Sequence, residues 1–62
     1  MPIVHIELWP GRTQDQKAEL AKVLTEAMVS IANTPAQEVI VVFQEVEKSN
    51  WAKAGLLASE SG

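Results

Sequence analysis

The sequence predicts an α/β (α+β) fold class, in the form of a single β-α-β unit followed by a short C-terminal arm or hairpin. Three observations lead to this prediction. Polarity alternates along residues 2–9, a helical apolar pattern covers residues 14–32, and β-branched residues dominate 39–46. Two strands separated by a helix are typical of a parallel β-α-β unit. A chain of 62 residues has room for one domain, so we expect a single domain over residues 1–62.

The first predicted strand has one apolar face. Val4, Ile6 and Leu8 alternate with His5 and Glu7, which is the period of two that a half-buried strand shows. The dipeptide Pro-Gly at residues 10–11 is a turn signal, and it ends the strand.

The predicted helix carries a start signal and a stop signal. Thr13 and Gln16 have the spacing of a capping box. Asn33 tolerates the left-handed conformation that ends many helices, and Pro35 cannot continue the helix. One apolar stripe at helical spacing runs between these signals, and it consists of Leu20, Val23, Leu24, Ala27, Met28 and Ile31.

The second predicted strand reads VIVVFQEV over residues 39–46. A continuous β-branched run of this kind predicts burial on both faces, as in a parallel pair. One helix and two strands cannot cover so much apolar surface, so we expect another copy of the chain to complete the sheet. The tail from residue 49 contains Trp51 and a Leu56-Leu57 pair, and we expect it to reach a neighbour as an arm or hairpin.

Length and composition favour a homo-oligomer. A chain this short buries only about 60% of its unfolded surface, so it needs disulfides, a metal or partner subunits. Cysteine is absent, which excludes disulfides and fits a reducing cytoplasm. His5 is the only histidine and the eight carboxylates are scattered, so we expect no metal and no cofactor.

The charge balance limits the partners. The net charge is −3, with four lysines and one arginine, which argues against nucleic acid. No signal peptide is visible, and no segment reaches the roughly 18 to 20 apolar residues of a membrane span, so we expect no membrane partner and a cytoplasmic location. An anionic substrate would depend on a few local cations, among which Arg12 is the only arginine.

Four residues are candidates for chemistry: Pro2, Trp9, Arg12 and Trp51. If Met1 is removed, Pro2 becomes a free secondary amine. Burial and a nearby cation both favour the neutral amine, which is the form that acts as a general base. Arg12 can bind a carboxylate in a bidentate pair, and the tryptophans can exclude water.

Each candidate also has a purely structural interpretation. Proline at position 2 favours methionine removal whatever its later role, and an arginine beside a turn is usually a solvated charge. Trp9 and Trp51 are the kind of residue that anchors a core or an interface. Taken one by one, these residues therefore predict no more than a small, soluble, oligomeric β-α-β protein.

Together, the same residues resemble a known family. Pro2 behind Met1, the stretch GRTQDQK at residues 11–17, the β-branched second strand and the tryptophan-containing tail are similar to the 4-oxalocrotonate tautomerase family over nearly the whole chain. The resemblance implies a tautomerase-like fold whose four-stranded sheet is completed by dimerisation. It also implies a homohexamer built as a trimer of dimers, with a dimer or trimer as alternatives.

The resemblance implies an isomerase. Pro2 aligns with the catalytic proline, which interconverts the enol and keto forms of a small 2-hydroxy-dienoate or 2-keto acid as general base and then acid. Arg12 aligns with an arginine that binds the substrate carboxylate, and Trp51 with an aromatic residue of the pocket. Trp9 occupies a lining position that is leucine in the best-known members, so it narrows the pocket.

One position departs from the family pattern. The well-studied members carry a second substrate-binding arginine in the second strand, contributed by a neighbouring subunit, and the matching residue here is Ile40. Loss of a guanidinium from a desolvated charge pair costs on the order of 2–5 kcal/mol. Either Lys48 or Lys53 replaces it, or the natural substrate has one carboxylate and an apolar or aromatic end that Ile40 and the tryptophans accommodate.

Two other functions remain as alternatives. A chain that keeps Met1 would have no free amine at Pro2, and it would serve as a non-catalytic, tautomerase-like interaction module. Dehalogenation or decarboxylation within the same superfamily is less favoured, because no residue is convincingly placed to activate water.

Overall fold

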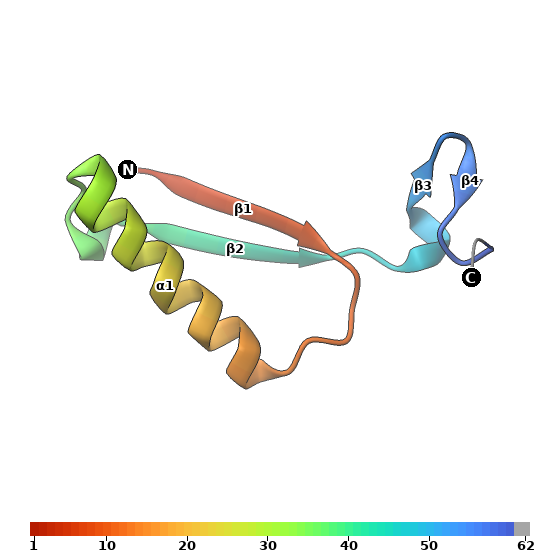
Figure 1. Cartoon of the computed structure of the whole chain (residues 1–62), viewed down its shortest axis with the longest axis horizontal. Coiled ribbons are helices and arrows are strands. Elements are labelled where there is room, and N and C mark those ends of the chain that lie inside the picture. Colours follow the sequence, from red (N-terminus) through yellow and green to blue (C-terminus); the bar gives the residue numbers. More distant parts are fainter. Residues whose placement is uncertain (61–62) are drawn as a thin grey trace.

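The computed structural model describes residues 1–60 and consists of a two-stranded parallel sheet, one long helix and a small hairpin (Figure 1). In chain order the elements are β1 (Ile3–Leu8), α1 (Gln14–Ala32), a 3-10 turn (Ala36–Glu38), β2 (Ile40–Glu45), a second 3-10 turn (Lys48–Asn50), β3 (Ala52–Lys53) and β4 (Leu56–Leu57). The predicted β-α-β unit and the C-terminal hairpin are confirmed. Both long strands are one residue shorter at each end than the sequence pattern indicates.

The two long strands are paired in parallel along their whole length. Ile3 lies opposite Ile40, and Leu8 lies opposite Glu45. One backbone bond extends the ladder at each end: the Ile40 N–H donates to the Pro2 carbonyl at 3.1 Å, and the Val46 N–H donates to the Leu8 carbonyl at 2.8 Å. Pro2 therefore takes part in the sheet through its carbonyl group, the only ladder group that a proline has.

Helix α1 begins and ends where the capping residues predict. The Thr13 N–H donates to Gln16 Oε1 at 2.9 Å, and the Gln16 N–H donates to Thr13 Oγ1 at 3.1 Å, which completes the capping box. At the other end Asn33 is left-handed, with φ 56° and ψ 39°, and its N–H donates to the Met28 carbonyl. Local sequence is sufficient to set both helix ends.

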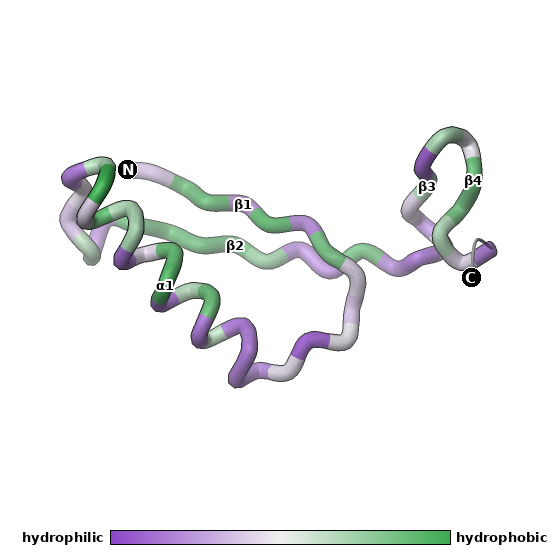
Figure 2. The backbone as a smooth tube through the Cα atoms, viewed as in Figure 1, coloured by the Kyte–Doolittle hydropathy of each residue, from purple (hydrophilic) through white to green (hydrophobic). Residues whose placement is uncertain are grey.

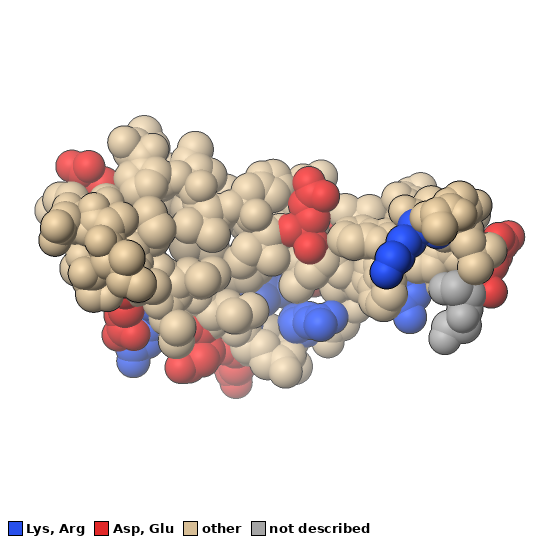
Figure 3. Space-filling model, turned by 45° about the horizontal axis from the view of Figure 1, so that its top comes forward, with Lys and Arg blue, Asp and Glu red and all other residues tan. Residues whose placement is uncertain are grey.

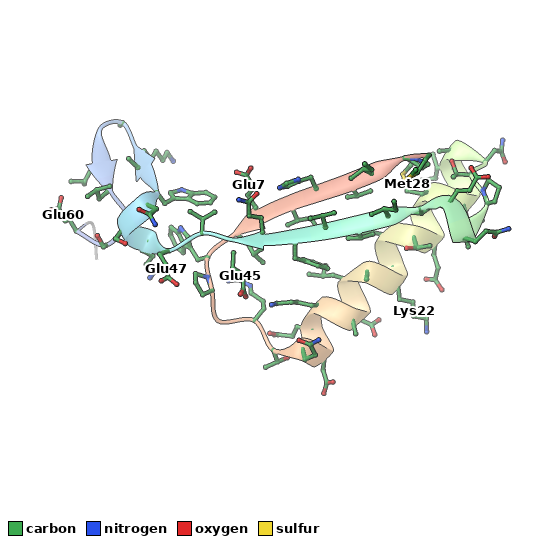
Figure 4. All side chains as sticks on the ribbon, turned by 180° about the vertical axis from the view of Figure 1, so that it is seen from behind. Glu7, Lys22, Met28, Glu45, Glu47 and Glu60 are labelled. Atoms are coloured by element: carbon green, nitrogen blue, oxygen red, sulfur yellow. The ribbon has the colours of Figure 1, made fainter. Side chains whose placement is uncertain are left out.

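The sheet has one covered face and one open face. Helix α1 lies along the covered face, where alternate strand residues are half-buried (Figures 1 and 4). On the other face the exposed fractions are 61% for Ile3, 40% for Ile40 and 38% for Val42. The prediction that β2 is buried on both faces is therefore wrong for the single chain, because its one helix can cover only one face.

The single chain is elongated and has almost no closed core. Its radius of gyration is 14.7 Å, whereas a compact domain of this length has a radius of about 11 Å. Among residues 1–60, Ala58 alone is buried, with 8% of its surface still exposed. Figure 2 shows that the apolar residues instead follow the two long strands, one stripe of α1 and the hairpin. Much apolar surface of the single chain consequently faces solvent.

The C-terminal hairpin lies beyond the ends of β1 and β2, at the opposite end of the molecule from the N-terminus (Figure 1). Its turn residues Ala54 and Gly55 both have positive φ, 56° and 81°. A two-residue turn of this kind matches the twist of the flanking strands. The hairpin is attached to the preceding 3-10 turn, because the Ala58 N–H donates to the Trp51 carbonyl at 2.7 Å and the Ser59 N–H to the Lys48 carbonyl at 3.3 Å.

Candidate active site

Two tryptophans connect the end of β1 to the hairpin. Trp9 directly follows β1, and Trp51 directly precedes β3. Their rings meet edge to face, with centroids 6.0 Å apart and planes inclined at 74°. This geometry directs the positive edge of one ring at the negative face of the other, which is a favoured arrangement of aromatic pairs. The pair forms a rigid wall between two segments that are far apart in the sequence.

Two adjoining hollows share this wall. The first, which we call the apolar hollow, has a volume of about 300 Å³. It is lined by Trp9, Trp51, Lys53, Ala54, Leu56 and Ala58. The second, which we call the arginine hollow, has a volume of about 280 Å³ and is lined by Glu7, Leu8, Trp9, Arg12 and Trp51. A ligand in contact with both tryptophans can therefore reach a cation on one side and an apolar surface on the other.

Arg12 is exposed and available to bind an anion. It lies in the connection between β1 and α1, and within residues 1–60 it makes no ion pair or side-chain hydrogen bond. Lys17 differs, since its Nζ lies 2.9 Å from Glu45 Oε2. A guanidinium with no protein partner keeps all its donors for a carboxylate.

The cations are unevenly distributed over this acidic protein. Arg12 and Lys53 line the two hollows, and Lys48 Nζ lies 4.8 Å from the centre of the Trp9 ring. Three of the five cations thus surround the tryptophan pair. Figure 3 shows acidic and basic side chains at both ends of the molecule, with basic ones also in the middle. Glu7 also lines the arginine hollow, so binding of an anion there depends on direct contact with Arg12 and not on the net charge of −3.

Pro2 lies at the other end of β1. Between Pro2 and Trp9 the chain runs along the six residues of β1, and at about 3.3 Å per residue this places them more than about 20 Å apart. Beside Pro2 lies Ile40, whose N–H donates to the Pro2 carbonyl. The single chain thus divides the predicted site residues into two groups. Pro2 and Ile40 form one, and Trp9, Arg12 and Trp51 form the other.

The two glutamates of the strands do not face one another. Glu7 lies opposite Gln44, whereas Glu45 lies opposite Leu8. Figure 4 shows Glu7 and Glu45 projecting from opposite faces of the sheet. On the open face, His5 Nε2 lies 3.0 Å from Gln44 Oε1 and 3.8 Å from Glu7 Oε2. No paired carboxylates are therefore available here for acid–base chemistry.

Sequence reasoning missed the part of the hairpin that lines the apolar hollow. Leu56, Ala54 and Ala58 lie against the tryptophans only because the chain reverses at residues 54–55. Their sequence signal was the apolar Leu56-Leu57 pair after Gly55, which indicates a short apolar segment but not the surface it contacts. Over residues 1–60 no group of three potential metal ligands occurs, and no helix combines the length and apolar character of a membrane span.

Comparison with known proteins identifies the family. The family described as "Tautomerase enzyme" matches residues 2–60. This chain belongs to that family, and it is an isomerase of the tautomerase type. The predicted tautomerase-like fold and the predicted membership of the 4-oxalocrotonate tautomerase family are thereby confirmed.

Similar proteins cover almost the whole chain. A 2-hydroxymuconate tautomerase of Pseudomonas putida is 39% identical over 62 residues, which is 100% of this chain and 98% of the relative. A probable tautomerase of Lactiplantibacillus plantarum is 38% identical over 97% of this chain and 94% of its own.

The solved structures agree. A heterohexamer 4-oxalocrotonate tautomerase from Chloroflexus aurantiacus is 35% identical, with a TM-score of 0.89 and coverage of 97% of both chains. A 4-oxalocrotonate tautomerase isozyme from Methylibium petroleiphilum is 34% identical, with a TM-score of 0.90 and coverage of 98% of both.

Proposed function

We propose that this enzyme interconverts the enol and keto forms of a small 2-hydroxy-dienoate or 2-keto acid, with Pro2 as general base and acid after Met1 is removed. In the ketonisation direction the Pro2 nitrogen takes the proton of the enol hydroxyl. The electron pair of that O–H bond forms the π bond of the carbonyl, the enol C=C π bond breaks, and its electron pair forms a C–H bond with the proton that Pro2 delivers. The product is an isomer of the substrate, so the step needs no oxidant, reductant or cofactor.

The other residues divide into binding and shaping roles. Arg12, which has no protein partner within residues 1–60, binds the substrate carboxylate. Trp9 and Trp51 keep the bound substrate away from water, which strengthens the charge pair with Arg12. Ile40 lies next to Pro2 and gives that end of the site an apolar surface. Such surroundings favour the neutral form of the amine, which is the form a base requires.

A site built in this way contains residues of more than one copy. The observation that carries this proposal is the separation of Pro2 and Arg12 at opposite ends of β1. We propose a homo-oligomer in which β1 and β2 of two copies form one sheet, so that Pro2 of one copy approaches Arg12 of another. The preferred assembly is a homohexamer, as a trimer of dimers, and the heterohexamer from Chloroflexus aurantiacus is a precedent for six subunits.

The exposed surface of the single chain supports association. The chain exposes 4744 Å², whereas a compact monomer of its mass exposes about 4,000 Å². The excess, on the order of 800 Å², is about what each partner buries in a standard interface. The exposed residues Ile3, Ile40 and Val42 on the open sheet face belong to this excess.

The experiment that tests the proposal mixes two impaired variants. Pro2→Ala should lower turnover by about 10²–10⁴-fold, the usual contribution of a general base. Arg12→Ala should chiefly raise KM. When both variants are co-expressed with different tags and the mixed oligomer is purified, about one site in four should regain both residues, because each site draws them from different copies. At substrate concentrations far below KM, activity should then rise well above that of either variant alone.

Two controls make the result decisive. Size-exclusion chromatography must show the same oligomer for all variants, and intact mass must show that Met1 is absent. A mixed oligomer no more active than the variants would contradict a shared site. A Pro2→Ala enzyme with wild-type turnover would exclude proline catalysis, and a wild-type chain that retains Met1 would favour the non-catalytic module.

A further inference from the structure

We propose that the substrate is an aryl 2-oxo acid with a single carboxylate. This inference rests on the proposed function and specifies its substrate class. It is carried by two features of the described residues: the apolar hollow that adjoins the arginine hollow, and the lack of a second arginine, since Lys53 is the only other cation that lines the two hollows.

The binding surface has the shape that an aromatic ring linked to a carboxylate requires. The two hollows share Trp9 and Trp51, so the space beside Arg12 continues directly into the apolar hollow. Apart from Lys53, the lining of the apolar hollow consists of tryptophan, leucine and alanine side chains. A cavity of about 150 Å³ already holds a benzene ring. The volume of about 300 Å³ therefore accommodates an aromatic ring together with the short chain that links it to a carboxylate.

The tryptophan pair can serve as a surface that binds an aromatic ring. The two tryptophan rings meet edge to face and are not stacked on each other, and both line the two hollows. A substrate ring can then pack against indole with the offset or edge-to-face geometry that aromatic pairs prefer. A conjugated dienoate can also place its planar carbons against these rings, but its second carboxylate would lose hydration there.

Few lysine or arginine side chains are available to bind carboxylates in the two hollows. Neither β1 nor β2 contains a lysine or arginine, so the strands of every copy contribute none to a shared site. Lys17 is paired with Glu45, and Lys48 lies over Trp9. Within the two hollows, this leaves Arg12 and Lys53. An ammonium on a flexible stem cannot reproduce the bidentate geometry of a guanidinium, so one carboxylate is held strongly and a second is not.

The sheet neighbours of Pro2 are apolar. Its sheet neighbours Ile3 and Ile40 lie opposite each other and are 61% and 40% exposed. The end of the substrate that reaches Pro2 from a neighbouring copy thus meets isoleucine side chains. An uncharged group is accepted there, whereas a second carboxylate would be desolvated without a partner.

Binding and turnover are measured separately to test the proposal. Trp9 and Trp51 are the only tryptophans of the chain, so quenching of intrinsic fluorescence reports directly on this wall. Using the Pro2→Ala oligomer, in which turnover is suppressed, phenylpyruvate and 2-hydroxymuconate are titrated in parallel. Phenylpyruvate should bind about tenfold more tightly, since burial of a ring adds apolar area without adding charge. Equal binding, or tighter binding of the dicarboxylate, would overturn the proposal.

Two substitutions test which residues cause the binding preference. Leu56 is 50% exposed, so Leu56→Gln can be made without opening a core. It should weaken phenylpyruvate binding about threefold to tenfold and change binding of the dicarboxylate little. Lys53→Met tests the competing arrangement, with Lys22→Met on α1 as the matched loss of charge. The wild-type protein could instead bind the dicarboxylate more tightly than phenylpyruvate. If Lys53→Met removes that preference and Lys22→Met does not, Lys53 binds a second carboxylate and the proposal is wrong.

The outcome separates this inference from the proposed function. Proline-dependent turnover with a preference for the dicarboxylate would retain the isomerase and refute the aryl substrate. Tight, Leu56-dependent binding of phenylpyruvate, together with wild-type turnover in Pro2→Ala, would retain the substrate class and refute proline as the base.

Discussion

The Nζ atom of Lys48 lies over the ring of Trp9, 4.8 Å from its centre. The backbone of the same lysine accepts hydrogen bonds from the N–H groups of Trp51 and Ser59, both at 3.3 Å. Lys48 therefore contacts the end of β1 through its side chain and the hairpin through its carbonyl group. This one residue connects the two segments that form the tryptophan wall.

The side-chain contact of Lys48 should contribute measurably to stability. Lys48→Met retains the length of the side chain but removes its charge, and an exposed cation–π contact contributes about 0.5–1 kcal/mol. We expect the free energy of unfolding per chain to fall by this amount in urea titrations at matched protein concentration. Lys48→Arg should retain most of it, because arginine also binds ring faces. No loss in Lys48→Met would show that the contact has no stabilising role, and equal losses in both variants would show that the charge over the ring is not its source.

Substitution of Arg12 should separate binding from turnover. A hydrogen bond to a charged group contributes about 1.5–3 kcal/mol, so Arg12→Ala should raise KM roughly tenfold to a hundredfold and change kcat less. Arg12→Lys should give an intermediate KM, because it restores the charge without the bidentate geometry. Steady-state kinetics on both variants, with Lys22→Ala as the surface control, provide the measurement. Unchanged kinetics in Arg12→Ala would remove this residue from the site.

Loss of the helix cap should destabilise α1 without altering the site. Thr13→Ala removes the oxygen that accepts the Gln16 N–H, and such a loss costs about 1 kcal/mol. We expect a lower midpoint in thermal unfolding followed by circular dichroism at 222 nm. Thr13→Ser should unfold like the wild type, since serine retains the hydroxyl. A Thr13→Ala protein as stable as the wild type would mean that the cap contributes nothing in the assembled protein.

A substitution in the hairpin turn should raise the stability of the protein. Ala54 adopts φ 56°, a left-handed conformation that costs a residue with an ordinary side chain roughly 1–2 kcal/mol. Asparagine tolerates this conformation and precedes glycine in the preferred turn of this type, so Ala54→Asn should raise the thermal midpoint. Ala54→Val should lower it, because β-branched side chains fit the left-handed region least. The opposite order would contradict the assigned turn.

Much of the fold was predictable because its determinants are local. The capping box at Thr13 and Gln16, and the left-handed Asn33, set the ends of α1 within their own hydrogen bonds. Alternation along β1 predicted which side chains the helix covers. The burial of β2 was predicted less well, because its β-branched run is typical of a strand covered on both faces, whereas the single chain offers only one covering helix.

The sequence by itself determined the β-α-β unit and the helix ends, because these follow from periodicity and capping chemistry. The candidate residues came from side-chain chemistry and from the family resemblance, and the ratio of surface to volume led us to expect partner copies. Only the tertiary structure decided how the candidate residues are grouped. The length of β1 separates Pro2 from Arg12, while the reversal of the chain at Ala54 and Gly55 folds the hairpin back beside the wall that Trp9 and Trp51 form. Distances between segments depend on how elements pack, and no local pattern in the sequence encodes them.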